Sequence, residues 1–423
     1  MRIFSLRRWC AVLAAGPALS LAAVVPGGVV VKQGDAVSGS TVSTLNSPFT
    51  DGNGKVSFVA ALADSNRVIW KDTGPIFNSS SSEDTLVGGE GTMGSSNAAD
   101  FIYSPSFNGN DAVYTNHEKL LAAGDPAPGL PGMWSSFNSR PQMAADGTAY
   151  WVGGITNVQG GSTQGRVLWR TTDVSNPATT TSLLKTGDLV NGLAVTSSGV
   201  GFDYAFSDNG SHSIMDLLLD SGSTTNDAHL AVNGVVVARE SLPTGQGDNW
   251  ANFDVVSIND AGDYIFSGDT DGATATDEFI AYNGAISLRE GSVVDGLTLG
   301  SSVNAASIND LSQVAFIWSS SATETLFAGD GGDLANSIAL LSVGDELDVN
   351  GDSIGDWVVT DFNASNIIGP GLDLAQDGRV YVEVDLQPIG GGTSMEAIIH
   401  VAIPEPSALA LMALGVTALR RRR

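Results

Sequence analysis

The residues best suited to chemistry in this chain are four oxygen-bearing side chains in one short segment. They stand at positions 1, 3, 5 and 9 of the stretch DVNGDSIGD: Asp348, Asn350, Asp352 and Asp356. Alternate oxygen side chains around a tight turn suit a hard cation, which gathers carboxylate and carbonyl oxygens. The spacing therefore predicts a calcium site at these four residues, and calcium is the one cofactor that the sequence suggests.

The pattern is similar to the first part of an EF-hand or dockerin calcium loop, and it departs from that loop twice. The sixth position is Ser353 where glycine is expected, and the twelfth is Val359 where a bidentate acid should complete the site. An ordinary loop of an acidic protein has the same look, so both interpretations stay open. Asp269, Asp271 and Asp277 form a weaker version of the same pattern.

Signals for other chemistry are missing from the sequence. The four histidines lack metal-site spacing, and there is no G-x-S-x-G elbow, P-loop or dinucleotide fingerprint. The single cysteine, Cys10, lies in the N-terminal segment, which excludes disulfides and thiol catalysis from the mature chain. We therefore predict no catalytic residue, although acids that meet only in space would escape this search.

A repeated phrase organises the body of the chain. The pattern N/D-x-x-G-x-x-A/S-F is clearest at residues 51–58, 259–266 and 309–316, and weaker copies start near Phe107, Ala144, Ser207 and Ala375. A period of about 50 residues is typical of propellers and solenoids. Asparagine or aspartate with glycine supplies a turn that needs positive φ, so we interpret these residues as structural.

Each repeat also contains the strands of one propeller blade. Gly-Asp or Glu-Gly pairs such as Gly34-Asp35 and Gly344-Asp345 precede most copies, and the unit around residue 260 has short β-type runs at 253–258, 264–267, 278–282 and 285–289. These patterns predict an all-β, β-propeller-like fold of about seven blades, each of four short antiparallel strands. Residues 397–403 are expected to close the ring near residues 29–32, and an open β-solenoid is the alternative.

Both ends of the chain have features that are typical of export signals. Residues 1–23 combine Arg2, Arg7 and Arg8 with an apolar run and the small residues Ala22 and Ala23, which is typical of a secretory signal peptide. Residues 403–423 begin IPEP, continue with an apolar run and end in four arginines. We therefore divide the chain into a signal peptide (1–23), a repeat domain (24–402) and a sorting signal (403–423).

The C-terminal segment resembles the PEP-CTERM signal of Gram-negative bacteria, which implies processing by an exosortase and a place at the cell surface or outside the cell. The alternative is a transmembrane helix that stays as an anchor, but its roughly 13 apolar residues fall short of the ~20 that span a bilayer. The membrane would then matter only through this segment before processing.

The repeats resemble the family of exported bacterial proteins described by tandem NxxGxxAF units and variable C-terminal anchors. The resemblance is strongest over residues 230–327, and Ser312 stands where the motif has glycine. Membership implies export and repeats, and no activity.

The charge balance limits the partners. With 46 acidic and 19 basic residues the net charge is −27, and loss of seven arginines with the two signals makes it more negative. Such a surface repels nucleic acid and anionic lipid, and leaves cations, basic partners and neutral polysaccharide. Exosortase is the predicted processing partner, with exopolysaccharide or surface proteins as candidate ligands.

Three functions are compatible with these sequence features. The first is a non-enzymatic surface or extracellular-matrix scaffold associated with exopolysaccharide. The second is a secreted propeller hydrolase or lyase acting on polysaccharide, which would need an acid pair with one raised pKa in a central pocket. The third is a calcium-stabilised structural protein. Trp134, Trp151 and Trp169 would stack on sugars if exposed, although burial between blades is the expected role of each.

Overall fold

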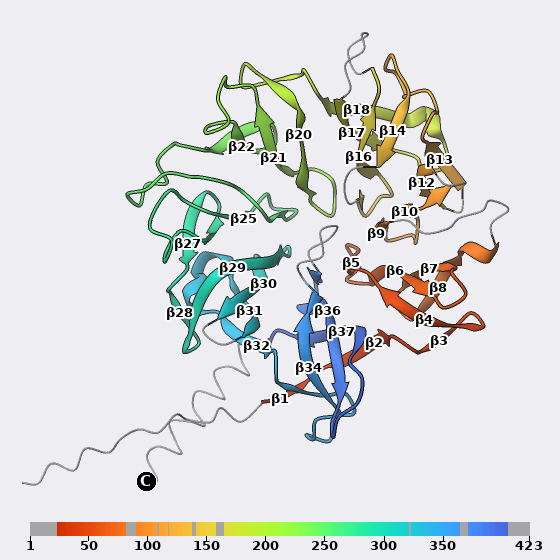
Figure 1. The fold of residues 1–423 in the computed structure, drawn as a ribbon, viewed down its shortest axis with the longest axis vertical. Helices are drawn as coiled ribbons and strands as arrows, with labels where there is room; N and C mark the ends of the chain where they lie inside the picture. The colour runs from red at the N-terminus through yellow and green to blue at the C-terminus, as the bar shows by residue number, and fades with distance from the viewer. Residues whose placement is uncertain are drawn as a thin grey trace, which may run out of the picture.

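Short strands around a central axis make up the body of the chain. The computed structural model describes residues 23–81, 90–107, 110–116, 118–137, 141–157, 165–320, 323–363 and 371–404. Their strands form seven hydrogen-bonded sheets, which Figure 1 shows arranged as a ring. We number them 1 to 7 along the chain. The ring confirms the predicted all-β, propeller-like fold.

The first three sheets come from the N-terminal half. Sheet 1 contains β3 (Ala36–Val37), β4 (Ser40–Leu45), β5 (Phe49–Thr50), β6 (Val56–Leu62), β7 (Arg67–Lys71) and β8 (Gly74–Asn78). Sheet 2 contains β9 (Glu90–Ser95), β10 (Phe101–Ser104), β11 (Ser106–Phe107), β12 (Asn110–Thr115) and β13 (Glu118–Ala122). Sheet 3 contains β14 (Trp134–Phe137), β15 (Gln142–Met143), β16 (Ala149–Ile155), β17 (Gly165–Thr171) and β18 (Thr180–Lys185).

The remaining sheets complete the ring. Sheet 4 contains β19 (Leu189–Val190), β20 (Leu193–Phe206), β21 (Ser213–Leu219), β22 (Ala228–Val232) and β23 (Val235–Arg239). Sheet 5 contains β24 (Val256–Ile258), β25 (Tyr264–Gly268), β26 (Phe279–Tyr282) and β27 (Ala285–Arg289). Sheet 6 contains β28 (Val293–Val294), β29 (Leu297–Ile308), β30 (Gln313–Ser320), β31 (Glu324–Asp330) and β32 (Ile338–Ser342).

Sheet 7 is built from both ends of the chain. It contains β33 (Glu346–Asp348), β34 (Trp357–Phe362), β35 (Leu372–Leu374), β36 (Arg379–Pro388) and β37 (Met395–Ala402), together with β1 (Val24–Pro26) and β2 (Gly28–Lys32). The described helices are three short 3₁₀ segments, η1 (Ser79–Ser81), η2 (Pro177–Thr179) and η3 (Gly331–Asn336). The four strands predicted around residue 260 are confirmed as β24 to β27.

The N-terminal strands close the ring. β2 pairs antiparallel with β37, with Val29 opposite Ile399 and Lys32 opposite Ala397. β1 pairs with β33 at the other edge of the same sheet. The predicted closure is therefore confirmed, and the open solenoid is excluded because both edges of sheet 7 are covered by the start of the chain.

Hydrophobic clusters fill the spaces between neighbouring sheets. Each pair of neighbours shares one cluster, including sheets 7 and 1, where Val31, Phe58 and Ile398 pack together. Trp134, Trp151 and Trp169 are fully buried in or beside sheet 3. Their predicted burial is confirmed, and none of them is available to stack on a sugar.

Seven turns of one design line the inner rim, and each joins two consecutive strands of the same sheet. We call them the axial turns and name them by their first residues, all of them buried: Asp51, Ser96, Ala144, Ser207, Asn259, Asn309 and Ala375. In each turn the fourth residue donates its N–H to the carbonyl of the first. That fourth residue has positive φ in all seven turns, as expected of a three-residue hairpin loop with a bulge.

The side chain of the first residue explains the preference for asparagine or aspartate. Asn309 Oδ1 accepts hydrogen bonds from the N–H groups of Leu311 (3.1 Å) and Gln313 (3.0 Å). The same pattern occurs at Asn259, Asp51 and, with a hydroxyl, Ser96. The interpretation of the repeated phrase as structural punctuation agrees with this geometry.

One copy of the repeated phrase and one of the predicted Glu-Gly turns do not lie where the sequence placed them. The copy near Phe107 falls on the hairpin between β11 and β12, whereas the axial turn of sheet 2 begins at Ser96. Serine replaces asparagine there, and Ala99 (φ 68°) replaces glycine, so the motif cannot be recognised. The predicted Glu90-Gly91 turn is instead the start of β9.

The two predicted signals lie mostly outside the described residues. The structure describes Ala23 of the first segment, and Ile403 and Pro404 of the second. Across the described ranges, no helix has both the length and the apolar character needed to cross a membrane. The transmembrane helix considered for the tail falls on residues that the structure does not describe.

Ala99→Gly is expected to stabilise the protein. Ala99 is exposed and sits in the left-handed region, which costs an alanine about 1–2 kcal/mol. The greater freedom of glycine in the unfolded chain offsets about 0.4–1 kcal/mol of this gain. Urea denaturation should show a net increase of about 0.5–1 kcal/mol in the free energy of unfolding. Ala98→Gly, in the same exposed turn without positive φ, is the matched control and should lower it.

Candidate functional site

The predicted calcium loop lies at the start of sheet 7, between β33 and β34. Asp348 ends β33 and is 5% exposed, while Asn350 and Asp352 lie in the exposed part of the loop. Ser353 occupies the left-handed region (φ 65°), the conformation for which glycine was expected. The structure thus brings the four predicted residues onto one tight loop.

The oxygens of this loop accept hydrogen bonds from the loop itself. Asp348 Oδ1 accepts from the N–H groups of Asn350 and Gly351, and its Oδ2 accepts from Ser353 N at 2.8 Å. Asp356 Oδ2 accepts from Val349 N at 2.9 Å, and Oδ1 from Asn350 Nδ2 at 3.1 Å. These bonds stabilise the loop, and those to Asp348 lower the pKa of its carboxyl against the opposing effect of burial.

The described part of the chain contains no group of three or more histidine, cysteine, aspartate or glutamate side chains arranged to hold a metal ion. A calcium ion at the loop would have to replace several of the N–H donors around Asp348. The calcium site at Asp348, Asn350, Asp352 and Asp356 therefore stays a prediction.

A polar cavity of about 110 Å³ lies on the axis of the ring. The inner strands of all seven sheets contribute to its wall, and the polar side chains that reach it include Thr50, Gln142, Ser257, Ser307, Asp208 and Asp373. Several occupy the position two residues before an axial turn. A ring of converging inner strands thus places two carboxylates in one central pocket.

Asp373 is the most heavily bonded group of the cavity. Its Oδ2 accepts from Thr50 N (2.7 Å) and Thr50 Oγ1 (3.0 Å), and its Oδ1 accepts from Ser307 Oγ and Leu374 N, both at 2.9 Å. Burial raises the pKa of Asp373, and these four donors act against that rise. The carboxylate therefore ties sheet 7 to sheets 1 and 6.

Asp208 belongs to the axial turn of sheet 4. Its Oδ2 accepts a hydrogen bond from Gln376 Nε2 at 2.9 Å, and Gln376 Oε1 accepts from Asp310 N at 2.9 Å. Burial raises the pKa of Asp208 to about 7, and the negative charge of Asp373 adds to the rise. Sheets 4 and 7 are not neighbours in the ring, so this contact crosses the axis.

The carboxyl groups of Asp208 and Asp373 together could act as an acid and a base in a proton transfer. A carboxyl with a pKa of about 7 is partly protonated near neutral pH, and a bonded carboxylate lies in the same cavity. This is the feature that the sequence analysis required of a hydrolase or lyase. The bonds of Asp373 to two neighbouring sheets are equally consistent with a structural role for this residue.

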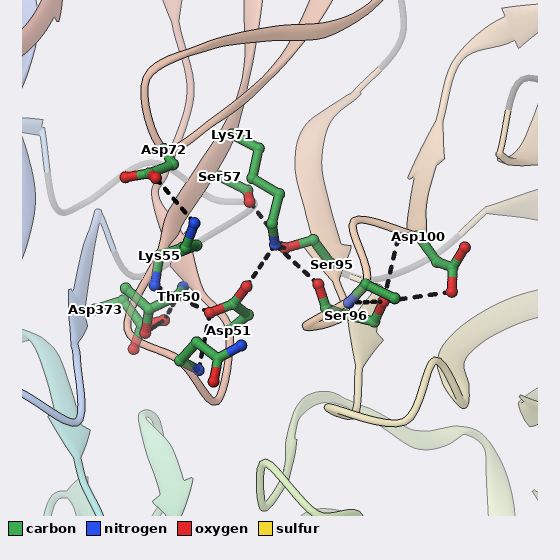
Figure 2. A network of polar contacts seen from close by, with 12 residues as sticks. Thr50, Asp51, Lys55, Ser57, Lys71, Asp72, Ser95, Ser96, Asp100 and Asp373 are labelled. Carbon is green, nitrogen blue, oxygen red and sulfur yellow. Dashed lines mark hydrogen bonds and ion pairs between the residues drawn. The ribbon is translucent and has the colours of Figure 1, made fainter.

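A buried ion pair lies within sheet 1, and its lysine also bonds to sheet 2 (Figure 2). Lys71 Nζ contacts Asp51 Oδ2 at 2.5 Å, Ser96 O at 2.8 Å and Ser95 Oγ at 3.1 Å. The side chains of Lys71 and Asp51 are 6% and 0% exposed. In sheets 5 and 6 an asparagine amide spans the same kind of interface, since Asn259 Nδ2 donates to Asn309 O. Asp51 has no such amide, and Lys71 supplies the donor.

A second buried acid lies between sheets 7 and 1. Glu383 on β36 is 2% exposed, and its Oε2 has no hydrogen-bond partner among the described residues. Burial raises the pKa of Glu383 to about 8, and the charges of Glu396 and Asp385 add to the rise. Glu396 itself accepts a hydrogen bond from Leu45 N at 2.8 Å. Glu383 is therefore mostly neutral at pH 7.

Sequence reasoning missed Asp208, Asp373, Gln376, Lys71 and Glu383. For the cavity residues a signal existed, because aligning the repeats on their first turn residue places Gln142, Ser257, Ser307 and Asp373 at one common position. Lys71 and Glu383 offer no such pattern. Lys71 acts through Asp51, which is distant in sequence, and the raised pKa of Glu383 comes mainly from its burial in the folded protein.

Lys71→Met should destabilise the protein strongly. The substitution leaves the Asp51 carboxylate buried without its cation, a change that typically costs about 3–5 kcal/mol. Lys55→Met is the matched control, because the Lys55–Asp72 pair is roughly half exposed and should contribute at most about 1 kcal/mol. Urea denaturation of both variants measures the difference, and equal effects would contradict a structural role for the buried pair.

Glu383→Gln should change the pH dependence of stability. The pKa of Glu383 is raised in the folded state from an unfolded value of ~4.3, so its contribution is fully present below ~4.3 and is lost as pH rises through about 8. Thermal melting should therefore show the variant above the wild type at pH 9. At pH 4 the two should nearly coincide, and a pH-independent difference would contradict the raised pKa.

Comparisons with known proteins support the sorting signal predicted at the C-terminus. A protein-sorting motif, PEP-CTERM, matches residues 402–423, which supports export and processing by an exosortase. No curated protein matches the chain. The resemblance to the NxxGxxAF family is not confirmed by a family match.

The chain also has low similarity to several solved structures. Prolyl oligopeptidase B from Galerina marginata is 9% identical, with 86% of this chain and 52% of that chain covered and a TM-score of 0.43. A protein of unknown function from Dyadobacter fermentans is 13% identical, with 90% and 98% covered and a TM-score of 0.35. An α-L-arabinanase from Penicillium chrysogenum, complexed with arabinobiose, is 13% identical, with 73% and 91% covered and a TM-score of 0.36. This chain spans about half the length of the first of these.

The main domain also matches a family model. The match covers residues 113–359, more than half of the chain, and the model is described as a family of unknown function, DUF7453. The chain therefore belongs to the DUF7453 family and carries a PEP-CTERM sorting motif at its C-terminus.

Proposed function

We propose that this exported propeller is a non-enzymatic scaffold of the cell surface or extracellular matrix that binds exopolysaccharide or another surface protein. The observation that carries the proposal is the use of the axial polar groups. Asp373, Ser307 and Gln376 all bond across sheet boundaries, so the groups best placed for catalysis hold the ring together. The sorting motif and the charge of −27 fit a surface role.

The net negative charge of the protein limits which class of polysaccharide it can bind. A strongly negative protein is repelled by anionic chains, so a neutral or amino-bearing polysaccharide is the preferred ligand. The test passes the purified mature protein over immobilised neutral, cationic and anionic polysaccharides at physiological salt. We expect retention on the neutral chains that persists at 0.5 M salt (about 4 Å of screening length). Retention on none of them, with release of reducing ends instead, would overturn the proposal.

A second candidate is a polysaccharide hydrolase or lyase, which is favoured by one observation. Asp208, with a pKa of about 7, shares the axial cavity with Asp373. An enzyme of this kind would release reducing or unsaturated ends from a soluble polysaccharide, and Asp208→Asn would lower the rate by about 100-fold or more. Product release that is unchanged in this variant would remove the candidate.

The third candidate is a calcium-stabilised structural protein, supported by the spacing of the Asp348 loop. Thermal melting of the mature protein with calcium and with chelator tests it. A rise of several degrees in calcium that is lost in Asp348→Ala with Asp352→Ala would support the site, whereas an unchanged melting temperature would remove it.

A further inference from the structure

Four Gly-Asp turns of the propeller share one arrangement of hydrogen bonds. In each of them one aspartate oxygen accepts from the N–H of the residue three positions earlier, and the four aspartates are Asp35, Asp125, Asp188 and Asp345. In each turn the aspartate N–H also donates to the carbonyl of that earlier residue. The turns are therefore equivalent, and their remaining contacts can be compared.

Three of these aspartates also bind a lysine ammonium group. Lys32 Nζ contacts Asp35 Oδ1 at 2.5 Å, Lys119 Nζ contacts Asp125 Oδ2 at 3.1 Å, and Lys185 pairs with Asp188. The turn thus holds a carboxylate that faces a cationic nitrogen.

The fourth aspartate has a different partner. Ser342 stands where Lys32 and Lys185 stand in the equivalent turns. The nitrogen that contacts Asp345 Oδ1, at 3.0 Å, is the main-chain nitrogen of Ala23. In the full-length chain this nitrogen is a neutral amide, but it becomes an ammonium group if the chain is cut directly before Ala23.

The sequence offers such a cut, one residue before the end of the segment that was predicted as the signal peptide (1–23). The residues before Ala23 are Ser20, Leu21 and Ala22, which place small side chains at the first and third positions before the bond, as signal peptidase sites require. A cut one residue later would place the large Leu21 at the third position. It would also remove the Ala23 carbonyl, which accepts a hydrogen bond from Glu346 N at 2.8 Å.

We propose that signal peptidase cleaves the Ala22–Ala23 bond and that Asp345 is the binding site for the α-ammonium group that this cleavage frees. Water adds across the peptide bond, giving a carboxylate on Ala22 and a protonated amine on Ala23. The new charge then takes the place that a lysine holds in the three equivalent turns. It fixes β1 to β33, at the edge of sheet 7 opposite the β2–β37 pair.

The site couples export to ring closure. The chain from Ala23 to Lys32 covers both edges of sheet 7, so anchoring its first residue holds the closing strands in register. With the signal peptide attached, the same nitrogen is an amide that donates to Asp345 without a charge. The mature chain should therefore be the more stable form.

The first measurement is the N-terminal sequence of the protein after export from a Gram-negative host. The expected sequence is Ala-Val-Val-Pro, starting at Ala23. A start at Leu19, at Val24 or at any other residue would overturn the proposed cleavage.

The second measurement tests the site itself. Protein that begins at Ala23 is compared with protein in which a methionine precedes Ala23, each with Asp345 or with Asp345→Asn. The charged pair should raise the melting temperature by about 1–3 °C only in the protein that begins at Ala23 with Asp345 intact. An Asp345→Asn effect of the same size in both forms would overturn the ammonium site.

The pH dependence of the Asp345→Asn effect on stability distinguishes this site from the equivalent turns in which a lysine binds the aspartate. An α-amino group titrates at about 8 in an unfolded chain, and a nearby carboxylate raises that value, so its stabilisation is present below about pH 8 and is lost above it. The Asp345→Asn effect should therefore disappear by about pH 10. The matched control Asp188→Asn removes a lysine partner and should keep more of its effect at that pH. Equal loss in the two variants would contradict an α-amino partner.

Discussion

Hydrogen bonding at the inner rim is the constraint on which the rest of this propeller depends. Where seven sheets converge on one axis, turn and strand-end amides are buried and need hydrogen-bond partners. The axial turns meet this need within the chain. Asn309 accepts from two N–H groups of its own turn, and its amide donates to Ala375 O at 3.2 Å in the next sheet. The same side chain shapes one turn and joins two sheets.

The variations around the ring follow from this requirement. Where the first residue is Asp51, which has no donor, Lys71 supplies one from the neighbouring strand. Where the first residue is Ala375, Gln376 takes over by bonding to both Asp310 and Asp208. The axial cavity is what remains inside these bonds, so its acids serve closure first. These bonds are the basis of the proposed scaffold function.

Much of the fold followed from local sequence. Asparagine or aspartate with glycine favours a turn with positive φ, and from such turns the strands around residue 260 and the closure by residues near Val29 were predicted correctly. Sheet 2 was misplaced because Ser96 and Ala99 adopt the same geometry with other residues. The cavity acids were missed because their raised pKa comes from burial and from charges on other sheets. The calcium loop remains a prediction, since the same oxygens serve its own N–H groups.

Urea denaturation of the Asn309→Ala variant tests the role of the axial turns most directly. Asn309 is fully buried and bonds to its own turn and to sheet 7. If such residues hold the ring, the substitution should lower the free energy of unfolding by about 2–4 kcal/mol, because it leaves buried amide and carbonyl groups without partners. A loss below about 0.5 kcal/mol, the level of an ordinary surface substitution, would contradict the account.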